Sequence, residues 1–408
     1  MKKIAVIGGG AAGMIAACAA ARAGNQVTVY EKNEKLGKKL YITGKGRCNV
    51  TNGADMETCM NQVVSNPRFL YSAFYMLDNQ ALMQLIEEGG CSLKEERGQR
   101  IFPVSDKSSD VIAALTRLMQ RAGVSVCLKT EIKKICSNGE KVTGIRTARG
   151  EMIPADAVIL ATGGLSYPST GSTGDGYRMA GELGHVKTAL RPALVPLVCS
   201  EEWAKELQGL ALKNIEIQVK DGKKVLYREF GEMLFTHFGV SGPVVLSASS
   251  RIAAALEKKP LTMLIDLKPA LTEEQLDARL LRDFGKEQNR QFKNSLSGLF
   301  PARLADTMVR LSGIDPQQQV NVISREQRRN LVQLTKNLPL TITGTRDYNE
   351  AIITQGGIRV KDVDPSTMES KLVPGLYFAG EVLDLDAMTG GFNLQIAWST
   401  GWLAGSSV

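Results

Sequence analysis

The sequence predicts an α/β protein in which a domain with a parallel sheet is interrupted by a β-barrel-like insert and a small helical subdomain. Three observations predict this fold class. Two apolar runs rich in β-branched residues, at 3–7 and 157–160, each end in a glycine cluster, as buried parallel strands beside a ligand do. Short strand-like runs lie between residues 194 and 267. A helical period with charged faces then extends from 272 to about 337.

The first glycine cluster is a dinucleotide-binding fingerprint in its expected context. The strand Lys3–Ile7 ends in G-G-G-A-A-G, which contains G-x-G-x-x-G, and an alanine-rich helix is expected from Met14 to Arg22. The first glycine permits a tight turn, the second lets the backbone approach a pyrophosphate, and the third allows close packing of helix on strand. This context predicts a Rossmann-like domain rather than an unrelated glycine-rich turn. The residues expected at the ligand are Gly8, Gly10, Ala12 and Gly13.

A carboxylate stands where such domains bind ribose. Gln26–Tyr30 is expected to form the second strand, and Glu31 follows it, about 20 residues after the fingerprint. A carboxylate there accepts hydrogen bonds from ribose hydroxyls and disfavours a 2′-phosphate, so FAD or NAD is preferred to NADP. Lys32, the next residue, is expected at the same site.

The segment at 36–52 favours FAD over NAD. An NAD dehydrogenase would continue with a helix and a third strand, whereas this glycine-rich segment is expected to be a loop whose backbone amides approach a planar ring. Its cations could neutralise phosphates or an anionic flavin, although a solvated basic loop is the alternative. Cys48 could be a reactive thiolate, but a packed small residue is the simpler interpretation. The expected cofactor contacts are Lys38, Lys39, Gly44, Arg47, Cys48 and Asn49.

Two later glycine clusters support the same cofactor. The strand Ala157–Leu160 ends in A-T-G-G, which resembles the second consensus segment of two-dinucleotide-binding flavoproteins and contributes Thr162 and Gly163. Asp175, a little further on, could simply cap a helix. Near the C-terminus an expected strand ends at Gly380 and Glu381. In FAD proteins built this way, an acidic residue at the Glu381 position bonds a ribitol hydroxyl, and the last helix directs its positive N-terminus at the flavin. The residues expected there are Gly391, Phe392, Asn393 and Leu394.

Composition narrows the class of protein. Lys and Arg total 50 against 42 Asp and Glu, and the net charge of +8 is spread along the chain, which is weak support for nucleic acid as a partner. Seven cysteines without a C-x-x-C argue against a zinc ribbon or a disulfide framework, and two histidines against a metal centre. The apolar start is interrupted by glycines, and no run reaches the roughly 18 apolar residues of a membrane span. A cytoplasmic protein that binds neither membrane nor nucleic acid is expected, in an oligomeric state that the sequence does not indicate.

Several motifs together resemble one family. Five motifs closely resemble the BaiN-like, YhiN-type flavoproteins: G-K-G-R-C-N-V-T-N (44–52), A-T-G-G-x-S-Y-P-x-T-G-S-T-G-D-G (161–176), L-F-T-H-F-G-V-S-G-P (234–243), T-Q-G-G-I (354–358) and G-L-Y-F-A-G-E-V-L-D-L-D (375–386). That bacterial family of FAD-dependent oxidoreductases includes enzymes described as aminoacetone oxidase and 3-dehydro-bile-acid Δ4,6-reductase. The resemblance spans almost the whole chain and implies an FAD cofactor.

The resemblance also implies a division into three parts, which the residue patterns support. Residues 1–190 and 340–408 would form a discontinuous FAD-binding domain, residues 191–270 a β-barrel-like insert and residues 271–339 a helical subdomain. A strand at 126–135 belongs to the FAD-binding domain, and the family places the backbone near Ile132 against the adenine. The strands expected in the insert are 194–198, 215–220, 224–227, 242–246 and 261–267.

The chemistry expected of such a protein belongs mainly to the flavin, so few catalytic side chains are needed. His237 is the best acid/base candidate, because a motif surrounds it and only two histidines occur; a structural histidine is the alternative. No second G-x-G-x-x-G occurs, so NAD(P)H, if it is the electron donor, must bind transiently. We expect NAD(P)H-driven reduction of an activated C=C bond in a hydrophobic ketone. The alternatives are oxidation of a small amine by O2, modification of RNA, and flavin binding without catalysis.

Overall fold

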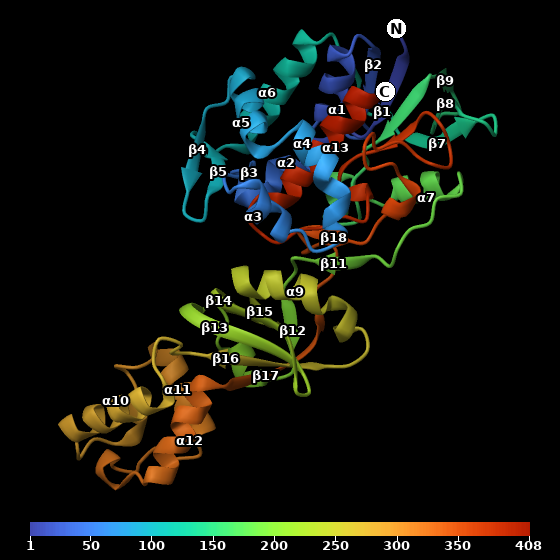
Figure 1. Ribbon diagram of the computed structural model, residues 1–408. Helices are drawn as coiled ribbons and strands as arrows, with labels where there is room; N and C mark the ends of the chain where they lie inside the picture. The colour runs from blue at the N-terminus through green and yellow to red at the C-terminus, as the bar shows by residue number, and fades with distance from the viewer. The chain divides into compact units, whose positions relative to one another are not determined.

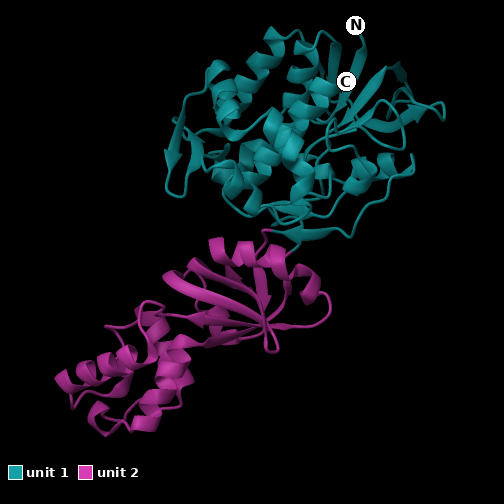
Figure 2. Ribbon diagram, viewed as in Figure 1, with its two compact units in different colours: residues 1–193, 347–408 teal, residues 194–346 magenta.

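The computed structural model describes all 408 residues and divides the chain into two units. Residues 1–193 and 347–408 form the first unit, and residues 194–346 form the second (Figure 2). Each unit encloses a hydrophobic core of its own, so the chain crosses between them only near residues 193 and 347.

A parallel sheet forms the centre of the first unit. Its strand order is β19-β10-β1-β2-β6, and every neighbouring pair is parallel. Buried on both faces, β10 consists only of apolar residues, as central parallel strands do. The strands are β1 Lys3–Ile7, β2 Gln26–Tyr30, β6 Ser125–Cys127, β10 Ala157–Leu160 and β19 Leu376–Phe378. The predicted Rossmann-like fold class is therefore confirmed.

Helix α1 (Ala11–Arg22) and the last helix, α13 (Phe392–Ser407), lie side by side in this unit (Figure 1). Their backbones come unusually close. A Cβ on Gly401 would lie 2.5 Å from the carbonyl oxygen of Ala12, and one on Gly405 would lie 2.2 Å from that of Ala16. Because only glycine permits this approach, the C-terminal helix is tied to the helix that opens the fingerprint.

The other elements of the first unit surround this centre. Three small antiparallel sheets join β3 to β5 and β4, β7 to β8 and β9, and β11 to β18. The strands are β3 Thr51–Asn52, β4 Leu93–Glu96, β5 Arg100–Pro103, β7 Ile132–Ser137, β8 Val142–Thr147, β9 Met152–Pro154, β11 Arg191–Ala193 and β18 Ile353–Gln355. The helices are α2 Lys38–Ile42, α3 Met56–Asn61, α4 Tyr71–Met76, α5 Asn79–Glu88, α6 Ser108–Arg121 and α7 Asp175–Gly181.

Two predictions for this unit need correction. The single strand expected at 126–135 is two strands: β6 lies in the parallel sheet, β7 lies in an antiparallel sheet, and residues 128–131 separate them. The loop expected at 36–52 contains α2 and a 3-10 turn at Thr43–Gly46. Gly37, with φ +66°, turns the chain into α2, and the glycines that suggested a loop start and end short helical turns instead.

The second unit is built on a closed antiparallel barrel, which confirms the predicted barrel-like insert. Its strands follow one another in the order β12-β15-β14-β13-β16-β17. Alternate residues of β13 and β16 are buried in the core, the pattern of a sheet with one covered face. The strands are β12 Leu197–Cys199, β13 Ala211–Asp221, β14 Lys224–Thr236, β15 Gly239–Ser241, β16 Leu261–Asp266 and β17 Leu338–Thr345.

Two predictions for the second unit also differ from the structure. The strand expected at 242–246 is the start of helix α9 (Pro243–Leu256), because Gly242 at φ +98° breaks the strand and Pro243 suits a first helical position. The boundary expected at residue 340 falls inside β17, which pairs with β12 and β16 and so belongs to the barrel.

Helices follow the barrel strand β16, where a helical subdomain was predicted. Helix α10 (Glu273–Lys286) and helix α12 (Arg325–Lys336) each begin with a capping box, formed by Thr272 with Gln275 and by Ser324 with Gln327. Helix α11 (Ala302–Ser312) lies between them in sequence, and α8 (Glu202–Glu206) precedes β13. None of the helices in either unit is both long and apolar enough to span a membrane.

Candidate cofactor-binding site

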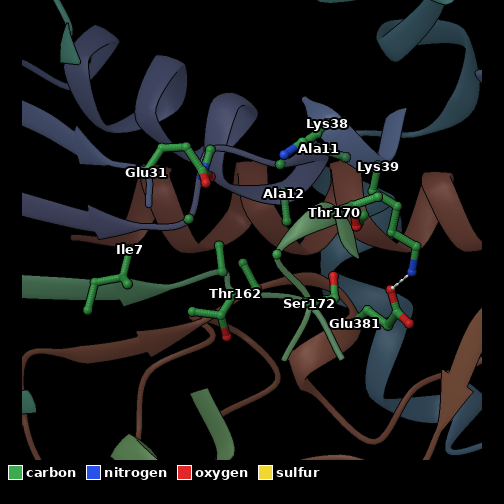
Figure 3. Close-up of a pocket in the computed structure, with 18 of the residues that line it drawn as sticks. Ile7, Ala11, Ala12, Glu31, Lys38, Lys39, Thr162, Thr170, Ser172 and Glu381 are labelled. Carbon is green, nitrogen blue, oxygen red and sulfur yellow. Dashed lines mark hydrogen bonds and ion pairs between the residues drawn. The ribbon is translucent and has the colours of Figure 1, made fainter. Parts of the chain in front are cut away.

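A long cavity lies at the carboxyl ends of the parallel strands, entirely within the first unit (Figure 3). The space within it, including the part that opens to solvent, is about 1340 Å³, and it is lined by the segments that follow β1, β2, β6 and β10, together with the start of α13. In open parallel sheets, ligands bind at this edge because the strand ends and helix N-termini converge there.

Glu31 is fixed toward one end of the cavity (Figure 3). Its Oε2 accepts a hydrogen bond from the backbone N–H of Gly9 at 2.7 Å. Its Oε1 accepts two from Asn33, from the backbone N–H at 2.8 Å and from the side-chain Nδ2 at 2.7 Å. The residue is only 8% exposed, and Oε2, which receives one bond, can accept a further one. The carboxylate is thus held in one orientation at the cavity wall, where Oε2 can accept a hydroxyl donor.

Lys32 and Asp175 form a second polar pair at the cavity. The Nζ of Lys32 lies 2.6 Å from Asp175 Oδ2 and 2.6 Å from Thr173 Oγ1. Burial acts to raise the pKa of Asp175, but the hydrogen bonds from Lys32 and Thr173 outweigh it and the pKa is lowered. Asp175 does not cap α7 through its side chain, since Gly174 is the N-cap and no side-chain cap bond is formed. Asp175 therefore positions Lys32.

Lys39 and Glu381 meet toward the other end of the cavity (Figure 3). Lys39 Nζ lies 2.6 Å from Glu381 Oε2 and 2.6 Å from Ser166 Oγ, and Ser166 donates to Glu381 Oε1 at 2.7 Å. The backbone N–H of Thr354 donates to the same Oε1 at 2.8 Å. This network joins α2, the segment after β10, β18 and the segment after β19, four parts of the chain that are distant in sequence.

The N-termini of α1 and α13 carry the positive ends of their helix dipoles, and no acidic residue in the first turn neutralises them. The first turns of α1 and α13 contain no acidic residue, and neither has a side-chain cap. The first N–H groups of a helix lack partners within the helix, so both ends can receive an anion. Asn393 and Leu394 of α13 line the cavity. The Asn393 side chain exchanges hydrogen bonds with the backbone of Ala387, accepting at 2.9 Å and donating at 2.7 Å, which fixes the segment before α13.

Comparison with known proteins identifies the family. A family model described as "HI0933-like protein Rossmann domain" matches residues 2–407. The chain belongs to this HI0933-like family. It is 34% identical over 410 residues to 3-dehydro-bile acid delta(4,6)-reductase of Clostridium scindens, covering 99% of this chain and 98% of that protein. It is 31% identical to the ribosomal RNA dihydrouridine synthase of Haemophilus influenzae, covering 99% and 97%.

Solved structures show a similar fold. The 3-ketosteroid-delta4-(5alpha)-dehydrogenase of Rhodococcus jostii superposes with a TM-score of 0.53 at 15% identity, covering 100% of this chain and 96% of that one. At this identity the likeness concerns the fold alone. The family places this HI0933-like protein among the FAD-dependent oxidoreductases.

The cavity of this HI0933-like protein fits FAD. The Oγ1 of Thr162 lies buried in the cavity wall and has no hydrogen-bond partner within the chain. A bound ligand could supply that partner. A Cβ built on Gly10 meets no atom within 4 Å, which leaves the turn before α1 open for a pyrophosphate. The carboxylate of Glu31 at one end and the N-terminus of α13 near the other suit a ribose and an electron-rich ring.

The structure brings many of the predicted site residues together. Those that line the cavity are Gly8, Gly10, Ala12, Glu31, Lys32, Lys38, Lys39, Ile132, Thr162, Gly163, Glu381, Asn393 and Leu394. Their contacts with FAD remain predictions. Four further residues line the cavity that the sequence motifs did not indicate, and each follows a strand or a glycine cluster: Asn33, Thr130, Thr170 and Ser172. Asn33 and Thr130 come soon after β2 and β6, and this position after a parallel strand could have indicated that they line the site.

The remaining predicted residues do not line the cavity. Arg47 forms ion pairs outside the cavity, with Glu96 and, at 2.6 Å, with Asp106. Its guanidinium lies 4.2 Å from the centroid of the Phe102 ring. It therefore does not face the cavity as a phosphate ligand. Cys48 is fully buried, and burial raises its pKa to about 12, so it is a packed thiol. The other residues outside the lining are Gly13, Gly44, Asn49, Gly380, Gly391 and Phe392.

His237, the predicted acid/base residue, lies in the second unit. It occupies the turn between β14 and β15, is exposed to solvent, and contacts the ring of Phe238 at a centroid distance of 4.9 Å. The other histidine is structural: His185 is buried, its Nε2 lies 2.9 Å from Ser370 Oγ, and burial lowers its pKa.

Proposed function

We propose that this HI0933-like protein uses NAD(P)H to reduce a C=C bond conjugated with a carbonyl group. One observation carries the proposal: the cavity that fits FAD belongs to a chain whose full-length relatives are named for reductions of this one kind. A 3-dehydro-bile acid with delta(4,6) unsaturation is a conjugated ketone, and dihydrouridine is uridine whose ring C=C, conjugated with a carbonyl, has been reduced. The reaction class is therefore common to two different substrates.

Bound FAD supplies the redox chemistry, because its reduced ring can give up a hydride. The side chains around the cavity then have binding and electrostatic roles. Glu31 would accept a ribose hydroxyl, the turn before α1 would hold the pyrophosphate, and the N-terminus of α13 would stabilise negative charge at the ring. The network of Lys39 and Glu381 fixes the wall between these parts.

Reduction of a C=C bond also needs a proton for the carbon that does not receive the hydride. The two electrons come from NAD(P)H, and we propose His237 as the group that delivers or relays the proton. Substitution of His237 by Asn should lower turnover while leaving FAD binding and the rate of flavin bleaching by NAD(P)H intact. A turnover unchanged in the variant would exclude this role.

Anaerobic stopped-flow mixing tests the electron donor. FAD-loaded protein should lose its visible flavin absorption rapidly with NADH or NADPH, and the reduced protein should regain it when a conjugated ketone is added. No bleaching with either nucleotide would refute the proposal. Bleaching by a small amine in place of either nucleotide, with the absorption restored by O2 and one peroxide formed per amine oxidised, would support oxidation of a small amine instead.

The leading substrate class is a hydrophobic ketone such as a steroid-type enone, as in the Clostridium relative. A second candidate is a uracil ring in RNA, favoured by the Haemophilus relative and by a surface described below. Reduced protein reoxidised by the enone but not by a uridine-containing RNA supports the first. The opposite pattern supports the second.

A further inference from the structure

A short helical rod beside α13 carries an exposed aromatic face. A 3-10 turn, Pro67–Leu70, leads directly into α4 (Figure 1). One side of the rod is buried through Leu70, Ala73 and Phe74. On the opposite side, Tyr71 is 63% and Tyr75 is 90% exposed, and neither side chain forms a hydrogen bond within the chain.

The spacing places both rings on one face. Residues four apart on an α-helix are neighbours, so Tyr71 and Tyr75 lie one above the other, with Arg68 one turn before them. Tyrosine commonly buries most of its ring, because the apolar part gains from leaving water. Two neighbouring rings left in solvent therefore indicate a surface that binds a partner.

An open hollow adjoins the start of this rod. Its rim carries Arg68, Lys361 and Lys371, all exposed, and its floor is apolar and includes Phe69 and Val363. No acidic side chain lines it. Asp362, next in sequence to Lys361, is directed to Arg359 at 2.9 Å.

The three cations of the hollow are available to a ligand. None of them forms an ion pair, and the one hydrogen bond among their side chains runs from Lys371 Nζ to the carbonyl of Lys361 at 3.2 Å. Three unpaired positive charges beside two exposed aromatic rings make one continuous surface, because Arg68 belongs to both the rod and the hollow.

This surface is connected to the cofactor cavity through a single segment. The N–H of Val64 donates to the carbonyl of Asp386 at 2.7 Å, and Asn66 Nδ2 donates to that of Asp384 at 2.8 Å. Leu385, between them, lines the cofactor cavity. A ligand held at the rod and hollow is therefore anchored next to the backbone that borders the cavity.

We propose that Arg68, Tyr71, Tyr75, Lys361 and Lys371 form a docking surface for single-stranded RNA. Exposed aromatic rings stack on unpaired bases and cations bind the phosphates, which is how proteins hold single strands. A hydrophobic ketone requires no such set of charges. A free dinucleotide is bound in enclosed clefts, whereas these rings stand in open solvent. The inference rests on the second candidate substrate of the proposed function and supplies its binding site.

Fluorescence anisotropy of FAD-loaded protein with a labelled single-stranded oligouridine tests the proposal without turnover. Wild-type protein should bind, and binding should weaken as salt is raised. Tyr75→Ala should weaken binding by roughly tenfold, whereas Tyr75→Phe, which keeps the ring, should bind like wild type. Removing two cations with Arg68→Ala and Lys361→Ala should reduce the slope of log affinity against log salt by about 1.4.

Arg149→Ala is the matched control, because it removes an exposed cation of the same unit from the turn between β8 and β9. It should leave binding by the surface unchanged, and all variants should keep the wild-type rate of flavin bleaching by NAD(P)H and the wild-type unfolding temperature. Oligouridine binding that survives both Tyr75→Ala and the double cation variant would overturn the proposal, as would absence of binding at low salt.

If the surface binds something other than RNA, the same variants should give different results. A raised KM for NADPH in Arg68→Ala, with unchanged oligouridine affinity, would assign the surface to the nucleotide donor and overturn RNA docking. A change from dimer to monomer in Tyr75→Ala, without an effect on RNA, would assign it to a second copy of the chain. Failure of NAD(P)H to bleach the flavin while oligouridine still binds would refute only the proposed reaction.

Discussion

At the scale of single residues, Glu31 is the side chain on which the cofactor assignment depends most directly. Its two oxygens are oriented by Gly9 and Asn33, so the carboxylate needs no rearrangement to accept a ribose hydroxyl at Oε2. Glu31→Ala should weaken FAD binding by about 1.5–3 kcal/mol, the usual loss for hydrogen bonds to a charged group. Fluorescence titration of the apoprotein with FAD measures it.

The control for that prediction lies three residues away. Glu34 is half-exposed and pairs with Lys38, so Glu34→Ala removes an equal charge without touching the hydrogen bonds of Glu31. It should leave FAD affinity nearly unchanged. Equal affinities for the Glu31 variant and wild type would mean that the ribose carboxylate has been misassigned.

Lys39 gives a second prediction at this scale. Its removal leaves the carboxylate of Glu381, whose side chain is 18% exposed, without its cation. Lys39→Ala should therefore lower the free energy of unfolding by about 1–3 kcal/mol. Lys38→Ala, which disrupts a more exposed pair, should lower it by less than about 1 kcal/mol. Chemical denaturation of both variants measures the difference, and equal losses would contradict a structural role for the Lys39 network.

At the scale of elements, the turn from β1 to α1 contains one glycine that the fold requires and another that is expected to matter only for cofactor binding. A Cβ on Gly13 would lie 1.9 Å from the carbonyl oxygen of Gly8, whereas one on Gly10 meets nothing within 4 Å. Gly13→Ala should therefore destabilise the apoprotein by about 1–3 kcal/mol, the cost of overpacking. Gly10→Ala should spare the apoprotein and weaken FAD binding about tenfold or more, because the added methyl occupies the place of the pyrophosphate.

Thermal unfolding with and without FAD distinguishes the two glycine variants. The apoprotein of Gly10→Ala should unfold at the wild-type temperature and gain less from added FAD, while Gly13→Ala should unfold at a lower temperature with or without it. A Gly10 variant that binds FAD as tightly as wild type would show that the turn does not contact the pyrophosphate.

At the scale of the whole molecule, two separate hydrophobic cores predict two unfolding transitions. One core lies within residues 1–193 and 347–408 and the other within 194–346, while the cofactor cavity is lined only by the first unit. Added FAD should therefore raise the temperature of one transition and leave the other in place, since a ligand stabilises only the unit that binds it. Differential scanning calorimetry measures both. One transition that shifts as a whole would show that the units unfold together.

Local patterns predicted the elements that depend on short-range physics. The strands Lys3–Ile7, Gln26–Tyr30 and Ala157–Leu160 have the bounds expected, because β-branched apolar runs that end in glycine form buried parallel strands. The fingerprint and Glu31 were found from spacing alone, since each role requires one residue type at one place. Helix α9 was missed because Val244–Leu246 is as apolar as a strand, and only the φ of Gly242 turns it into a helix.

The sequence by itself determined the fold class, the family and the cofactor, because strand, turn and helix signals and the residue types at a dinucleotide are local. Only the tertiary structure decided which charges serve the site. Lys39 faces Glu381 whereas Arg47, in the same glycine-rich segment, is held by Glu96 and Asp106, partners about 50 residues or more distant in sequence. Likewise, Arg68 of the aromatic rod and Lys361 line one hollow only because segments nearly 300 residues apart meet. Long-range contacts of this kind leave no trace in a local pattern.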